Sequence, residues 1–75
     1  MIPAGRYRHY KGNYYQVIGV AKHSETDEEL VVYRALYGTF ELWVRPLTMF
    51  TEHVEGNGNL VSRFEFVEDR PIPNE

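Results

Sequence analysis

The chain has 75 residues and a mass of 8.8 kDa, so it holds one small domain and has no room for separate cofactor and substrate domains. Hydrophobic residues make up 43% and charged residues 25%, which excludes a disordered tail, a collagen and a coiled coil. The absence of cysteine excludes disulfides and thiolate zinc sites, and the net charge of −3 does not favour a high-affinity nucleic-acid protein.

The first elements in chain order form a predicted hairpin. Arg6–Tyr10 is a short strand, and Lys11–Asn13 is a turn, because Gly and Asn tolerate positive φ. Tyr14–His23 follows with the period-two pattern of a strand. Gly19 in its middle predicts a bulge or a sharp bend.

A polar, acidic loop over Ser24–Glu28 leads to the next strand, Glu29–Tyr37. Alternation gives this strand two apolar faces, and a tight turn at Gly38–Thr39 ends it. One face holds Val31, Tyr33, Ala35 and Tyr37, and the other holds Leu30, Val32 and Leu36.

Phe40–Arg45 is the following strand, and Pro46 ends it because proline cannot donate to a ladder. Residues 46–52 then predict one helical turn with proline at its first position. We expect Met49 and Phe50 to plug one end of the core. On the strand, we expect Phe40, Leu42 and Val44 to point inward and Glu41, Trp43 and Arg45 to point outward.

The segment Glu55–Asn59 is the strongest turn signal in the chain. Leu60–Val67 after it is the last predicted strand, with Phe64 and Phe66 on one face. The domain is predicted to span residues 1–70, with a frayed C-terminal tail at 71–75.

These elements predict a mostly β fold of five short strands with one short helical turn. Exposed strand edges invite unwanted pairing, so we favour closure into a small SH3-like barrel. An open α+β sheet with one short helix is the alternative.

Several motifs together are similar to those of a known family. They are Gly5–Gly12 followed by Tyr15 and Val17, His23–Thr26, Tyr33–Gly38, Trp43–Pro46 with Met49 and Phe50, and Arg63 with Phe64. Over roughly residues 5–67 the chain resembles the small bacterial family catalogued as domain of unknown function 1653. The resemblance implies a compact, mostly β, stand-alone bacterial domain without an assigned activity, and it supplies no catalytic residues.

The leading site prediction is an aromatic and arginine surface. An exposed Trp43 beside Arg45 has the composition of a protein-binding hot spot, and several aromatic rings can also enclose a cation. The alternative is structural, with Trp43 covering a barrel end and Arg45 stacked on it. The residues predicted to bind a protein or peptide are Tyr33, Tyr37, Trp43, Arg45 and Arg63.

The alternative function is single-stranded nucleic-acid binding through the first hairpin. Such binding needs cations that follow the phosphates and aromatic rings that stack on bases. Residues 1–24 carry four basic residues and no acidic one, whereas all eleven acidic residues follow them. This asymmetry also arises when a basic strand pair neutralises acidic neighbours. The candidate residues are Arg6, Arg8, Tyr10, Lys11 and Tyr14.

Histidines and carboxylates give only a weak prediction of chemistry. His9, His23 and Glu25, with Glu52 and His53 elsewhere, match no metal-ligand spacing, so we expect histidines that order loops. Hydrolysis at the pair of His23 and Glu25 is the weakest hypothesis. No cysteine, nucleophile elbow or phosphate loop is present. We expect a non-enzyme without cofactor or metal.

Targeting features are absent from the sequence. Residues 1–6 lack the pattern of a signal peptide, and the longest apolar run is far below the roughly 18 residues of a membrane helix. We expect a cytoplasmic monomer that does not contact a membrane.

Overall fold

The structure is a computed structural model that describes residues 2–68, so the tail predicted at 71–75 lies outside the described residues. The fold is mostly β, as predicted, with one helical turn. The elements are β1 (Gly5–His9), β2 (Tyr14–Lys22), β3 (Glu29–Ala35), β4 (Leu42–Pro46), α1 (Leu47–Phe50), β5 (His53–Gly56), β6 (Asn59–Ser62) and β7 (Phe64–Glu68).

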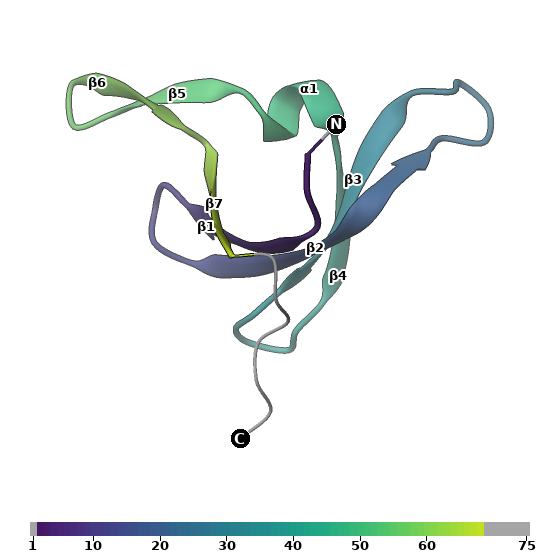
Figure 1. The fold of residues 1–75 in the computed structure, drawn as a ribbon, viewed down its shortest axis with the longest axis horizontal. Helices are drawn as coiled ribbons and strands as arrows, with labels where there is room; N and C mark the ends of the chain where they lie inside the picture. Colours follow the sequence, from purple (N-terminus) through teal and green to yellow (C-terminus); the bar gives the residue numbers. More distant parts are fainter. Residues whose placement is uncertain (1, 69–75) are drawn as a thin grey trace.

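Five strands form one antiparallel sheet in the order β4-β3-β2-β1-β7, and β5 and β6 form a separate hairpin. Figure 1 shows the large sheet bent into a U, with α1 and β5 across its opening. Within residues 2–68 the ladder ends at β4 and at β7. Closure into an SH3-like barrel therefore stays a prediction.

A bulge in β2 produces part of this bend. The register with β3 shifts between Val17 and Gly19, which confirms the bend predicted at Gly19. Ile18 is the extra residue and is 52% exposed. Because the bulge resets the alternation, Val17 before it and Val20 after it both contribute to the concave face.

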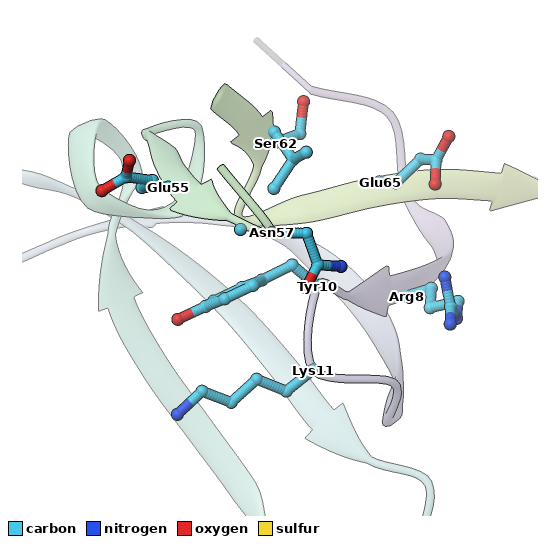
Figure 2. A pocket seen from close by; sticks show the side chains of 9 residues that line it. Arg8, Tyr10, Lys11, Glu55, Asn57, Ser62 and Glu65 are labelled. Atoms are coloured by element: carbon cyan, nitrogen blue, oxygen red, sulfur yellow. The ribbon is translucent and has the colours of Figure 1, made fainter. Parts of the chain in front are cut away.

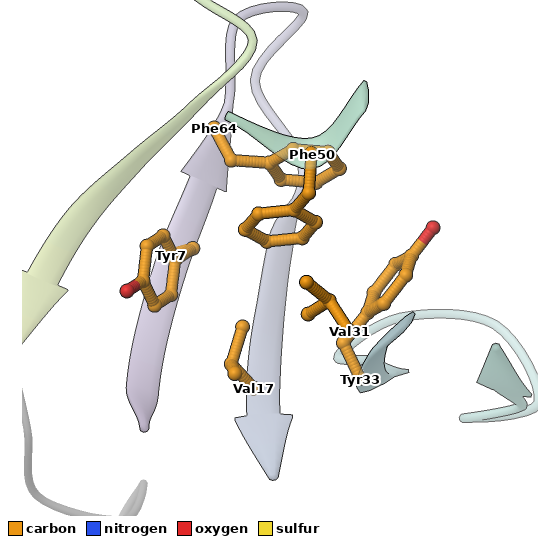
Figure 3. Packing of buried hydrophobic residues seen from close by; sticks show 6 residues of the cluster. All are labelled: Tyr7, Val17, Val31, Tyr33, Phe50 and Phe64. Carbon is orange, nitrogen blue, oxygen red and sulfur yellow. The ribbon is translucent and has the colours of Figure 1, made fainter. Parts of the chain in front are cut away.

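The core fills the concave face of the sheet and is largely aromatic (Figure 3). Phe50 from α1 stacks on Phe64 from β7, with ring centroids 4.0 Å apart and planes 3° apart. Tyr7 packs edge-on against Phe50 at 5.5 Å, and its hydroxyl donates to the carbonyl of Pro3 at 2.7 Å. Only Phe50 plugs the core, because Met49 is 44% exposed. The buried cluster is Tyr7, Val17, Val31, Tyr33, Phe50 and Phe64.

The inward and outward faces predicted for β4 are wrong. On β3, for which alternation predicts two apolar faces, Val31, Tyr33 and Ala35 are buried. Trp43 pairs with Tyr33, however, and directly paired residues share a face, so Trp43 lies on the concave side. The same register places Arg45, opposite Val31, on the concave side. The residues predicted to point inward are instead exposed: Phe40 50%, Leu42 52% and Val44 59%.

The length of the turn explains this error. A two-residue turn at Gly38–Thr39 would pair Tyr37 with Phe40. In the structure, Phe40 has φ 57° and belongs to the connection before β4, so the connection is longer than predicted. The observed register is one residue away from that pairing. A one-residue shift turns every side chain of a strand to the opposite face.

The strand predicted over Leu60–Val67 is also divided. Its first part pairs with β5, a strand the sequence did not predict, across a turn in which Asn57 and Gly58 have positive φ. The division falls at Arg63, whose carbonyl accepts from the N–H of Tyr10 and whose N–H donates to the carbonyl of Glu52, both at 3.0 Å. These bonds turn the chain from the hairpin into β7.

Candidate functional site

Strand β4 is an unpaired edge of the large sheet within the described residues. The N–H of Ala35 donates to the carbonyl of Glu41 at 3.0 Å, where the ladder with β4 begins. Bonded pairs alternate along an antiparallel ladder, so the N–H and C=O groups of Leu42 and Val44 point away from β3. The edge thus offers backbone donors and acceptors to another strand.

The side chains of this edge are apolar and exposed on both faces. Leu42 is 52%, Trp43 50% and Val44 59% exposed. Trp43 lies opposite the buried Tyr33, at the rim of the core. The sequence predicts Trp43 either as an exposed binding residue or as a structural cover, and its position has features of both. We call Leu42, Trp43 and Val44 the edge surface.

Arg45 extends from the same strand over the aromatic core. Its Nε donates to the hydroxyl of Tyr33 at 3.3 Å, and its guanidinium carbon lies 5.7 Å from the ring centroid of Phe64. Tyr33 is only 5% exposed, so its role here is to hold Arg45 and not to contact a ligand over its ring face. Arg45 itself is partly buried.

His9 also packs on Phe64, and the charges of Arg45 and Arg63 both act on its ring. The ring of His9 packs edge-on against Phe64 at 4.9 Å, and its Nδ1 accepts from the N–H of Lys11 at 3.1 Å. The neutral ring therefore carries its proton on Nε2. Burial lowers the pKa of His9, and nearby positive charges lower that pKa further. These charges belong to Arg45, Arg63 and Lys11.

Arg63 pairs with an acidic side chain. Its Nη2 donates to Oε1 of Glu52 at 3.0 Å, whereas its Nε is buried and has no hydrogen-bond partner among the described residues. The side chain of Glu52 is 51% exposed, so solvent screens this ion pair. The pair orients Arg63 and offsets part of its charge.

Two tyrosines complete the region. The hydroxyls of Tyr15 and Tyr37 lie 2.9 Å apart in a hydrogen bond. Burial and this bond raise the pKa of Tyr15 to about 12, so its hydroxyl stays protonated and can donate at neutral pH. We call the positive and aromatic region the concave mouth. It comprises His9, Tyr15, Tyr37, Arg45 and Arg63.

The structure brings four of the five predicted ligand residues to the concave mouth or its floor, and Trp43 to its rim. Sequence reasoning missed Tyr15 and placed His9 among metal candidates. The pairing of Tyr7 with Tyr15 and of His9 with Phe64 places both on the core face. A period-two pattern contains no signal for that cross-strand placement.

The residues predicted for nucleic-acid binding do not form one basic surface. Arg6 forms an ion pair with Glu68, and its guanidinium carbon lies 5.3 Å from the ring centroid of Tyr14. Arg8 lies directly opposite Glu65 in the ladder between β1 and β7. Both arginines thus lie beside carboxylates, which reduces their attraction for phosphates.

Tyr10 and Lys11 line a cleft of about 700 Å³ between the turn after β1 and the β5–β6 hairpin. Figure 2 shows Glu55 and Lys11 toward one end and Arg8 and Glu65 toward the other, with Tyr10 between them. This mixture of charges does not favour a polyanion. The full lining is Arg8, Tyr10, Lys11, Glu55, Gly56, Asn57, Val61, Ser62 and Glu65.

His23 orders the loop after β2. Its Nδ1 accepts from the N–H of Glu25 at 3.1 Å, and its carbonyl accepts from the N–H of Asp27 at 2.9 Å. The amide of Glu25, and not its carboxylate, therefore meets the ring. Within residues 2–68, no three His, Asp or Glu side chains gather closely enough to hold a metal ion. In the same range, no helix has the length and apolarity needed to cross a membrane.

Comparison with known proteins agrees with the motifs of the sequence. The family described as protein of unknown function (DUF1653) matches residues 5–66. The chain is similar to a crystal structure of a protein of this family from Bordetella bronchiseptica, with 35% identity, coverage of 96% of this chain and 95% of that chain, and a TM-score of 0.85. Among curated proteins none matches significantly. The predicted family is confirmed, and the chain belongs to the family of proteins of unknown function DUF1653.

Proposed function

We propose that this domain is a peptide-binding module whose ligand adds as an extended strand to β4. The observation that carries the proposal is the edge surface, which no strand of residues 2–68 pairs on its outer side and in which Leu42, Trp43 and Val44 are each at least half exposed. An exposed apolar edge is a liability for aggregation unless something pairs with it. Strand addition uses such an edge: the backbone bonds give affinity, and alternate side chains give specificity.

Two kinds of contact would hold the ligand. Its backbone would bond to the outward amide and carbonyl groups of Leu42 and Val44. Every second ligand side chain would lie beside Trp43 and Arg45 on the concave side, and the others would lie beside Leu42 and Val44. Trp43 would be the anchor, since tryptophan and arginine are enriched among binding hot spots.

The setting of this module is part of the proposal. The relative from Bordetella bronchiseptica supports a bacterial source, and the cysteine-free composition supports a reducing cytoplasm. We further propose that the domain is a monomer when no ligand is bound.

The test uses peptides selected on the whole domain from a displayed random library and followed by amide NMR. Trp43→Ala should weaken their binding by roughly 30-fold, the size of a tryptophan hot spot of about 2 kcal/mol. Val44→Pro removes an N–H that does not bond to β3, and proline is tolerated on a strand edge at such a position. This variant should keep its fold and lose most of the binding.

Val44→Thr is the matched control, because it retains the N–H and the β-branched shape, and it should bind as the wild type does. Peptides that change amide chemical shifts only outside β4, or that bind Val44→Pro as tightly as they bind the wild type, would refute strand addition. A monomer–dimer equilibrium that Val44→Pro abolishes would show that a second copy covers the edge, and would replace the peptide proposal.

A further inference from the structure

We propose that the peptide carries a carboxylate, which Arg45 binds at the concave mouth with Arg63 and His9 beside it. This inference rests on the proposed function and specifies the chemical class of its ligand. It predicts an extended peptide with an acidic group two positions away from an apolar residue. Nothing in the family description assigns such a ligand.

Arg45 is the main reason. Its Nε has the Tyr33 hydroxyl as a partner, but within residues 2–68 no carboxylate oxygen lies within 4.0 Å of its guanidinium. The side chain is partly buried, and the ring of Phe64 lies beneath it. An arginine held in this way presents a preformed pair of N–H donors that match a carboxylate in geometry and charge.

The surroundings of Arg45 reinforce this charge. The domain has a net charge of −3, yet Arg45, Arg63 and Lys11 all act on His9 at this one place. Glu52 is the acidic neighbour, and it is already paired with Arg63. A ligand carboxylate would therefore meet the charge of Arg45, which has no acidic partner within residues 2–68, inside an acidic protein.

The register of β4 specifies how the ligand reaches this region. Trp43 and Arg45 are two residues apart and lie on the same face. In an added strand, the residues opposite them are also two apart and also face the concave side. One of these positions therefore carries the acidic group, and the other carries an apolar side chain that packs on Trp43.

The Tyr15–Tyr37 hydroxyl pair supplies one neutral donor near the same point, because the other O–H group is used within the pair. Tyr37 is 44% exposed, its hydroxyl is bonded to that of Tyr15, and the charge of Arg45 acts on Tyr15. An oxyanion that bridges Arg45 and a tyrosine hydroxyl would gain a second charge-assisted hydrogen bond.

The probe is a short blocked peptide of alternating Val and Thr with a single Glu, titrated into the labelled whole domain. A second peptide has Gln in place of Glu, and a third has Gln with a free C-terminal carboxylate. In wild type, a carboxylate peptide should bind roughly tenfold more tightly than the blocked Gln peptide. Whether the first or the third peptide binds more tightly than the second identifies the source of the carboxylate, as a side chain or as a chain end.

Arg45→Gln should remove this tenfold preference, and Arg45→Lys should restore only part of it, because lysine lacks the planar fork. Arg8→Gln is the matched control. It removes the same charge from an exposed position in the separate cleft, and the preference should remain. Amide spectra of each variant report whether the fold is retained. If Arg45→Gln does not fold, the three peptides on wild type and their salt dependence still decide the question.

Two negative results are distinguishable. Equal affinity of the three peptides on wild type, with binding still abolished by Val44→Pro, would overturn the carboxylate inference and leave strand addition standing. The absence of binding by every peptide up to millimolar concentration would overturn strand addition, and the carboxylate inference with it.

Discussion

Phe50 is the side chain that connects the helical turn to the sheet. It is 1% exposed, stacks on Phe64 and meets Tyr7 and Tyr33 edge-on at 5.5 Å each. Its neighbour Met49 belongs to the same turn but is 44% exposed. Substituting each residue in turn therefore distinguishes the contribution of core packing from that of the helical turn itself.

Phe50→Ala should destabilise the domain by about 3–5 kcal/mol, because it removes a large ring and leaves a cavity against Phe64. A core of this size supplies only a few kcal/mol, so this variant should be mostly unfolded at 25 °C. Met49→Ala, the matched control, should cost less than about 1 kcal/mol. Urea unfolding followed by tryptophan fluorescence measures both values. Equal midpoints for the two variants would show that Phe50 does not hold the core together.

His9 makes stability depend on pH. Its pKa in the folded protein lies below the ordinary value of 6.5, because burial disfavours the charged ring and nearby arginines repel it. Below pH 6.5 the unfolded chain therefore binds more protons at this residue than the folded chain does. The stabilisation is present above pH 6.5 and is lost as the pH falls toward the folded pKa.

His9→Gln should therefore reduce the loss of unfolding free energy between about pH 7 and pH 5. The exposed His53 offers the control, and His53→Gln should leave the slope as in wild type. Urea midpoints at several pH values provide the measurement. A steeper loss in His9→Gln than in wild type would contradict the sign derived from burial.

At the scale of elements, the two faces of the first hairpin bear on the choice between peptide binding and nucleic-acid binding. Its strands place Tyr7 and Tyr15 on the core face and Arg6 and Arg8 on the opposite face. On that outer face each arginine lies next to a glutamate of β7. The hairpin is thus better suited to neutralising β7 than to binding a phosphate backbone.

A titration with a mixed single-stranded oligonucleotide at low and moderate salt tests this interpretation. We expect no localised amide shifts in β1 or β2, because the arginines already have acidic neighbours. Substitution of both Glu65 and Glu68 by Gln should then create weak, salt-sensitive binding, since the two cations would lose those neighbours. Strong salt-dependent shifts confined to the first hairpin of wild type would instead favour nucleic acid as the ligand.

At the scale of the whole molecule, the fold is a bent sheet whose concave side holds both the core and the candidate site. The rings of Tyr15, Tyr33 and Phe64 lie between 5.4 and 5.7 Å from one another, so they form a shared floor. Arg45 and Phe50 both contact this floor, at Tyr33 and at Phe64. Residues of the site therefore contribute to stability, which is why each binding test above includes a variant that leaves the core unchanged.

Sequence alternation and the positions of Gly, Asn and Pro by themselves determined the mostly β class, the first hairpin, the bulge at Gly19 and the helical turn after Pro46. These features depend on backbone preferences and alternation within a few residues, which a single sequence contains. Trp43 and Arg45 face the core because the connection before β4 includes Phe40 and is longer than predicted, and the register of β4 is shifted by one residue. The same is true of the site, because Arg45, His9 and Tyr15 come together only through cross-strand register. The tertiary structure decided these points, since register is set by turn geometry and by packing between strands, and alternation along one strand is the same in either register.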